Sequence, residues 1–197
     1  VIGFYIKKIS DYLINNFGEN KNILFWGGFF IAISSIGISF SLGKLIELSY
    51  VQSRNHFFSG LLIFFGLSSC IATKGLISSV KEIVELLESK EINDQNERII
   101  KDRVQRIVSR DVSSSSKKHL LRSSTESLTE NSVDGIFGPL FWIFIGIVLM
   151  KFSIILPGPL SLGFSYKAIS TLDSMIGYKY DYFKYLGFFS AKIEDIF

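Results

Sequence analysis

Two long stretches in the first third of the chain contain no charged residue. The first covers the 22 residues of 22–43, and the second covers the 19 residues of 55–73. About 20 residues of α-helix, at ~1.5 Å per residue, cross the ~30 Å hydrocarbon core of a bilayer. We therefore predict membrane-spanning helices at about 23–42 and 57–76. The alternative is a pair of buried core helices, which so short a chain could hardly cover.

Residues 135–166 form a third apolar stretch, in which Lys151 is the single charge. The sequence Pro157-Gly158-Pro159 near its middle is typical of a turn. Either residues 136–156 form one span, with Lys151 reaching to the interface, or the chain turns near Pro157 and returns through 160–176. The residues themselves leave both alternatives open.

The segment 78–135 is polar and contrasts with the rest of the chain. It holds ten Lys and Arg and eleven Asp and Glu, more than half of all the charges. Apolar residues recur at helical spacing within 80–87 and again within 100–108, which predicts two amphipathic helices. We expect a water-exposed helical insertion.

Composition narrows the class of protein. The 197 residues are 48% hydrophobic and 15% aromatic, with one Cys and two His, which excludes a disulfide scaffold and a zinc site built from Cys and His. The net charge of +3 is too balanced for a nucleic-acid partner. The predicted fold class is all-α: a polytopic helical membrane protein with a water-exposed helical insertion. We expect a single domain over 1–197, in a multi-pass arrangement in the cell membrane with lipid around it.

Charged residues recur every fourth position near the end of the insertion. Arg122, Glu126, Glu130 and Asp134 place one guanidinium and three carboxylates on one face of a helix. Such a face suits a divalent cation that holds phosphate oxygens. From spacing alone, a solvated charged surface is the simpler interpretation.

Three sequence blocks resemble one known family. Residues 126–135, ESLTENSVDG, followed by Pro-Leu-Phe at 139–141, are similar to the E-T-x-A-E-N-x-x-D-G-x-x-x-P-L-F motif of the adenosylcobinamide-phosphate synthases, the CobD/CbiB family. Residues 166–179, YKAISTLDSMIGYK, resemble its Y-K-A-x-N-T-L-D-S-M-x-G-Y-K block, and 190–195, SAKIED, resemble its S-A-R-x-D-D. Arg-Asp at 110–111 stands where the family has its G-R-D. The resemblance is strong from about residue 100 onward.

Four positions depart from the family pattern. Ser109, Ser170, Lys192 and Glu194 stand where the family has Gly, Asn, Arg and Asp. Lysine in place of arginine loses bidentate recognition of a carboxylate or phosphate, so no role is carried to Lys192. The family's C-terminal portion is absent, and we expect the chain to be a fragment.

The resemblance implies a membrane-embedded ligase of cobalamin biosynthesis. It would join a propionate carboxylate of adenosylcobyric acid, a corrinoid, to aminopropanol or aminopropanol phosphate through an amide. Amide formation in water is uphill and needs an activated carboxylate, so ATP and Mg²⁺ are the implied cofactors. Other cobalamin-assembly enzymes are further expected partners. No Walker-type phosphate loop is present, because Phe164-Ser165 follow the glycines where Lys-Ser/Thr is required.

The candidate site residues fall into three roles. The expected metal ligands are Glu126, Glu130 and Asp134. The expected catalytic residues are Asp173, Lys167 and Glu130. The expected substrate and phosphate ligands are Arg110, Asn131, Thr171, Ser174 and Lys179.

Two further interpretations bear on topology and function. Positive charges flanking the apolar stretches favour a cytoplasmic amino end and a cytoplasmic insertion. Since ATP and the corrinoid are cytosolic, the motif blocks at 126–135 and 166–179 should both face the cytoplasm. Residues 136–176 should therefore enter the membrane and return. The carboxylates of Asp134 and Asp173 should then lie within about 10–15 Å of each other. The alternative function is a corrinoid or other small-molecule transporter subunit, in which Lys151, Lys167 and Asp173 would line a pathway.

Overall fold

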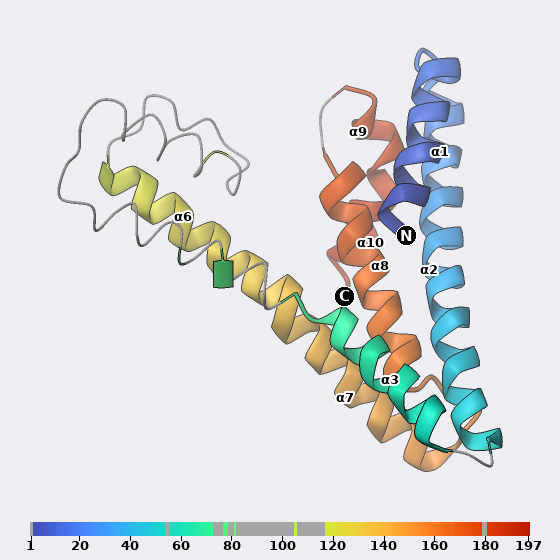
Figure 1. Ribbon diagram of the computed structural model, residues 1–197. Helices are drawn as coiled ribbons and strands as arrows, with labels where there is room; N and C mark the ends of the chain where they lie inside the picture. The colour runs from blue at the N-terminus through green and yellow to red at the C-terminus, as the bar shows by residue number, and fades with distance from the viewer. Residues whose placement is uncertain are drawn as a thin grey trace. The chain divides into compact units, whose positions relative to one another are not determined.

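The computed structural model describes residues 2–53, 56–72, 77–78, 81, 105, 117–178 and 181–197 (Figure 1). These residues are helical wherever they are regular, and no strand occurs among them. The helices are α1 (Ile2–Phe17), α2 (Lys21–Gln52), α3 (His56–Cys70), α6 (Lys117–Ser132), the π-helix η1 (Val133–Phe137), α7 (Gly138–Phe152), α8 (Pro159–Ile176), α9 (Phe183–Leu186) and α10 (Phe188–Glu194). The all-α prediction is confirmed for the described residues. Apart from the single residues 81 and 105, the two amphipathic helices predicted within 80–87 and 100–108 lie outside them.

The chain forms two compact units. One consists of Val1–Cys70 with Pro139–Phe197, and the other of Ile71–Gly138. The first unit contains α1, α2, α3, all of α7 except its first residue, and α8 to α10, and the second contains α6 and η1.

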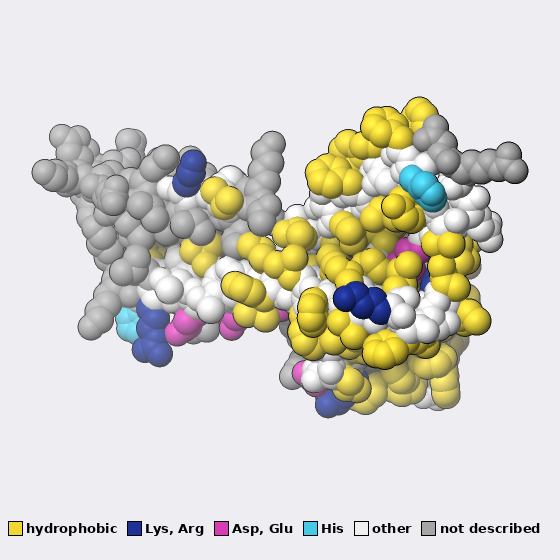
Figure 2. Space-filling model, turned by 90° about the horizontal axis from the view of Figure 1, so that it is seen from below, with side chains coloured by type: hydrophobic (Ala, Val, Ile, Leu, Met, Phe, Trp, Pro, Cys, Tyr) yellow, Lys and Arg dark blue, Asp and Glu magenta, His cyan; other side chains and the backbone are white. Residues whose placement is uncertain are grey.

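Within the described part of the chain, two helical stretches are long and apolar enough to cross a membrane. They are Lys21–Gln52, with 32 residues, and Arg122–Phe152, with 31 residues. Only 33% and 17% of the residues in their most apolar windows are buried, whereas the core helix of a soluble protein is mostly buried. Large apolar side chains such as Trp26 are more than half exposed, and hydrophobic side chains cover much of the described surface in Figure 2. This is the pattern of a helical membrane protein.

The helix α3 is shorter than predicted from the sequence. It ends at Cys70, and Ile71 and Ala72 are not helical, so its 15 residues do not fill the predicted range 57–76. The N–H of Ala72 instead donates to the carbonyl of Gly135 at 2.9 Å. This hydrogen bond to a residue distant in the chain replaces the helical one that the local apolar sequence predicted for Ala72.

Small residues let α2 pack closely on α8. The buried positions of α2 recur every three or four residues, which places them on one face; they are Leu24, Gly28, Ile31, Ala32, Ser35, Ser39, Gly43 and Glu47. A Cβ atom on Gly43 would lie only 2.6 Å from the Cα of Ser161 in α8. The apolar core that results joins α1, α2, α8 and α9 through Ile6, Leu24, Ile31, Ala32, Leu172, Ile176 and Leu186.

The close approach at Gly28 leads to a prediction. A Cβ atom there would overlap the backbone carbonyl of Leu186, whereas a Cβ atom on Gly37 meets nothing within 4 Å. Gly28→Ala should therefore lower the free energy of unfolding by about 1–3 kcal/mol, because backbone cannot give way as a side chain does. Gly37→Ala, the matched control, should be neutral or slightly stabilising. Thermal unfolding of the detergent-solubilised protein distinguishes the two, and equal melting temperatures would refute this packing.

The chain turns back at residues 153–158, between α7 and α8. Gly146 in α7 lies against the backbone of Gly158 and Pro159, and a Cβ atom on Gly163 in α8 would lie 3.1 Å from Ile143. The two helices are therefore antiparallel neighbours. Pro159 is the first residue of α8, a position where its missing N–H costs nothing. Where 136–156 and 160–176 lie relative to a bilayer stays a prediction.

Candidate functional site

The predicted acidic face lies on α6 and continues into η1. The Nε of Arg122 donates to Oε1 of Glu126 at 2.9 Å, and the arginine side chain is 77% exposed, so this is a surface pair. Glu130 and Asn131 are exposed, and Asp134 is half-buried. The carboxylate of Glu126 is thus already engaged by an arginine, while Glu130 is exposed.

Asp134 lies in the π-helix, which the fourfold spacing did not predict. The N–H of Gly138 donates to the carbonyl of Val133, five residues earlier, and this widens the turn that carries Asp134. The widened turn changes the position of Asp134 relative to Glu130. Single π-helical turns are concentrated at functional sites.

The three carboxylates are too far apart to surround one Mg²⁺ ion, but one or two of them could bind it together with phosphate and water. Glu126 and Asp134 are eight residues apart, roughly 12 Å along a helix. No group of three or more His, Cys, Asp or Glu side chains converges on one point within the part of the chain that the structure describes. Magnesium is commonly held by one or two carboxylates, with phosphate oxygens and water completing its shell. Glu130 and Asp134 suit that role. The assignment of Glu126, Glu130 and Asp134 as metal ligands stays a prediction.

The second candidate block lies in the last part of α8. Thr171 donates its hydroxyl hydrogen to the carbonyl of Lys167 at 2.7 Å, and Ser174 donates to the carbonyl of Thr171 at 3.0 Å. Both hydroxyls therefore use their hydrogen on the helix backbone and would meet a substrate as acceptors. Lys167 and Asp173 are half-buried, and their separation of six residues directs them about 120° apart around the helix.

Gly177 has a specific reason to be glycine. It ends α8, where its N–H donates to the carbonyl of Asp173 at 2.8 Å, and a Cβ atom on it would overlap the carboxylate of Asp173. The glycine of the T-L-D-S-M-x-G sequence thus leaves room for the aspartate side chain to lie against the end of the helix. Two further predicted ligands, Arg110 and Lys179, lie outside the described residues.

A buried ionic site at the other end of α8 was missed by the sequence analysis. Glu47 of α2 is 2% exposed, and its Oε1 accepts hydrogen bonds from the N–H groups of Leu160 at 2.7 Å and Ser161 at 2.9 Å. The carboxylate thus caps the positive N-terminal end of α8. The signal that could have revealed it is simple: Glu47 is the only acidic residue between Glu19 and Glu82.

Lys44 completes this site from the same face of α2. Its Nζ lies 3.8 Å from Oε2 of Glu47 and donates to the carbonyls of Ile154 and Leu156 in the turn after α7. Gly158 leaves room for the glutamate, since a Cβ atom there would overlap its carboxylate. The pair therefore binds both the turn and the start of α8, the helix that carries the second motif block at its other end.

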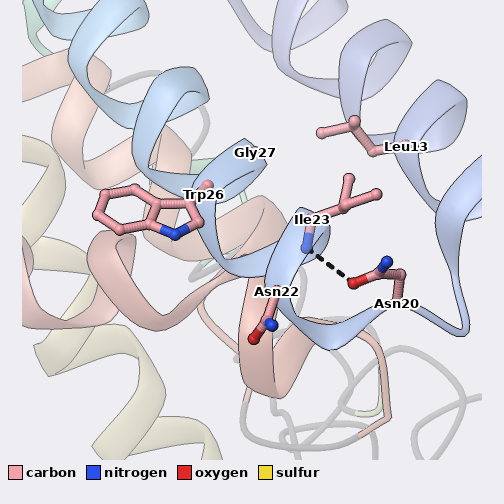
Figure 3. A pocket seen from close by; sticks show the side chains of 6 residues that line it. All are labelled: Leu13, Asn20, Asn22, Ile23, Trp26 and Gly27. Atoms are coloured by element: carbon pink, nitrogen blue, oxygen red, sulfur yellow. Dashed lines mark hydrogen bonds between the residues drawn. The ribbon is translucent and has the colours of Figure 1, made fainter.

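A hollow of about 430 Å³ lies between α1 and the start of α2 (Figure 3). It is lined by Leu13, Asn20, Asn22, Ile23, Trp26 and Gly27. Asn20 is occupied in capping α2, with its Oδ1 accepting from the N–H of Ile23 at 3.2 Å. None of the described residues that line it is ionisable.

Fold and site together define the class of this chain as a helical membrane protein with carboxylates on a helix next to an apolar segment. A family model described as CobD/Cbib protein matches residues 1–197. The chain belongs to the CobD/CbiB family, which confirms the resemblance stated on its three sequence blocks.

Curated relatives agree with the family. The chain is 35% identical over 196 residues to the cobalamin biosynthesis protein CobD of Clostridium acetobutylicum, covering 100% of this chain and 56% of that protein. It is 31% identical over 194 residues to the protein of the same name from Synechocystis, covering 98% and 53%. It is 36% identical over 169 residues to the probable cobalamin biosynthesis protein CobD of Methanocaldococcus jannaschii, covering 85% and 48%. The chain thus spans about half the length of these relatives. No solved structure matches it.

Proposed function

We propose that the full-length protein acts in cobalamin biosynthesis as an adenosylcobinamide-phosphate synthase, an ATP-dependent carbon–nitrogen ligase. It would join a propionate carboxylate of adenosylcobyric acid to the amine of aminopropanol or aminopropanol phosphate. The observation that carries the proposal is the family match over the whole chain, together with the two motif blocks on α6–η1 and α8. The transporter alternative is not favoured, because the matching relatives carry biosynthetic names.

The reaction balances through an acyl phosphate. A propionate oxygen attacks the γ-phosphorus of ATP, ADP leaves, and the neutral amine then attacks the activated carbonyl and displaces inorganic phosphate. The amine loses one proton, which Asp173 would take as the general base. Lys167 would balance charge on phosphate oxygens, and Arg110, Asn131, Thr171, Ser174 and Lys179 are the proposed ligands of substrate and phosphate.

Three carboxylates are proposed to serve the nucleotide. Glu126, Glu130 and Asp134 would hold Mg²⁺, with Glu130 also close to the reacting groups. Bound Mg²⁺ supplies electrostatic stabilisation of the phosphoryl group. The side chains themselves orient the nucleotide, and the exposure of Glu130 leaves it accessible to ligand.

We place the protein in the cell membrane with several passes and with its polar insertion in the cytoplasm. Support comes from two helices of sufficient length and hydropathy and from the charges that flank the apolar stretches. This orientation gives the acidic face access to cytosolic ATP. The expected partners are the corrinoid, membrane lipid and other cobalamin-assembly enzymes.

Genetic complementation tests the proposal. The full-length gene should restore cobalamin-dependent growth to a strain that lacks its own synthase and receives adenosylcobyric acid. Cobinamide supplied to the same strain bypasses the step and serves as the control. Growth with cobinamide but none with the gene, despite membrane-inserted protein, would contradict the proposed activity.

A further inference from the structure

A second groove, distinct from the predicted ligase residues, lies where α2 begins. It has a volume of about 510 Å³ and is lined by Lys21, Asn22 and Phe25 of α2, Lys184 and Tyr185 of α9, and Phe188 of α10. We call it the Lys21–Lys184 groove. Its two lysines come from segments far apart in the chain, and the packing of α2 against α9 and α10 brings them to one place.

The groove carries two positive charges, and none of the described residues that line it is acidic. Lys21 and Lys184 are exposed, and among the described residues neither forms an ion pair. The ammonium of Lys21 lies 5.5 Å from the centroid of the Tyr185 ring, a cation–π contact that holds the side chain over the groove without neutralising it. The amide of Asn22 adds a hydrogen-bond donor. The lining therefore favours an anion.

The wall next to these charges is aromatic. The rings of Phe25 and Phe188 have centroids 5.4 Å apart, and Phe188 is 44% exposed. Lys21 is the first residue of α2, and the 22 residues after it carry no charge until Lys44. A helix that spans a bilayer places such a lysine at the interface, with its aromatic neighbours toward the acyl chains.

We propose that the Lys21–Lys184 groove binds the headgroup of an anionic phospholipid. The phosphate would lie between the two ammonium groups, and the first part of an acyl chain would lie along Phe25 and Phe188. A basic pocket between helices at the membrane surface is the arrangement that recognises such lipids, and a soluble phosphate would leave the aromatic wall uncovered. The inference rests on the proposed membrane placement of α2 and is independent of the ligase chemistry.

Native mass spectrometry of the full-length protein tests the proposal. Titration with phosphatidylglycerol should show saturable binding that phosphatidylcholine does not reproduce. Lys21→Ala/Lys184→Ala should weaken phosphatidylglycerol binding on the order of 10- to 30-fold, since each lysine near an anionic surface contributes about 1 kcal/mol. Lys21→Arg/Lys184→Arg should retain most of the binding, because the charges remain.

The matched control removes the same charge elsewhere. Lys7 and Lys8 are both exposed on α1, and Lys7→Ala/Lys8→Ala should leave binding within about threefold of the unaltered protein if attraction to the groove is specific. Equal weakening in the two double variants would show nonspecific electrostatics and overturn the site. Displacement of the lipid by millimolar inorganic phosphate or aminopropanol phosphate would identify a soluble phosphate as the occupant and overturn the lipid assignment. If the alanine variant fails to fold, Lys21→Gln/Lys184→Gln removes the same two charges and should weaken phosphatidylglycerol binding to the same extent.

Discussion

Replacing Glu130 or Asp134 with alanine in the full-length protein should reduce adenosylcobinamide-phosphate synthesis by well over about tenfold, equivalent to ~1.4 kcal/mol of lost transition-state stabilisation. The reason is that each change removes a proposed ligand of the metal-bound nucleotide. Glu130 is exposed and Asp134 is half-buried, so neither change opens a large cavity. Rates measured on membranes that contain equal amounts of each variant check the prediction.

Arg122→Ala is the control on the same helix. Its side chain is 77% exposed and its partner is the surface carboxylate of Glu126, so the variant should lose little stability, within about 1 kcal/mol, and should keep most of its activity. If Glu130→Ala and Asp134→Ala both kept the activity of the unaltered protein, the acidic face would be a solvated surface and nothing more.

Glu47→Ala should destabilise the folded protein by roughly 3–5 kcal/mol, the usual cost of removing one partner from a buried ionic site. The change leaves the N–H groups of Leu160 and Ser161 without their acceptor and leaves Lys44 without its carboxylate. Thermal unfolding in detergent measures the loss. Glu47→Gln, which keeps the shape and one acceptor oxygen, should fall between the alanine variant and the unaltered protein.

A double-mutant cycle with Lys44→Ala strengthens this test, because the stability changes caused by two substitutions in one buried network should not add. Glu19→Ala removes an exposed carboxylate and should change stability by less than about 0.5 kcal/mol. A melting temperature of Glu47→Ala equal to that of Glu19→Ala would contradict the capping role assigned to Glu47.

The sequence predicted those parts of the fold that depend on local composition. The uncharged run after Lys21 indicated the apolar helix that became α2, and Pro157-Gly158-Pro159 indicated the turn before α8. The hydrogen bonds of Glu47, in contrast, join residues 113 and 114 positions apart. The spacing of hydrophobic residues cannot predict such a contact. It also cannot predict that α3 ends as early as Cys70.

The candidate site was predictable mainly through the motif resemblance. Spacing placed Glu126 and Glu130 on one face of a helix, as the structure has them on α6. Spacing could not show that Asp134 lies in a π-helical turn, because a widened turn arises from one shifted backbone hydrogen bond. The resemblance makes Thr171 an expected substrate ligand, and only the structure shows that its hydroxyl hydrogen is donated to the carbonyl of Lys167.

Direct assay of the ligation tests whether the full-length protein is an adenosylcobinamide-phosphate synthase. Membranes containing the full-length protein would receive adenosylcobyric acid, aminopropanol phosphate and Mg-ATP, with the product followed by mass spectrometry and the nucleotide by chromatography. We expect adenosylcobinamide phosphate and one ADP for each amide formed, and neither product without ATP. Movement of the corrinoid across the membrane with no consumption of aminopropanol phosphate or ATP would contradict the ligase and favour a transporter.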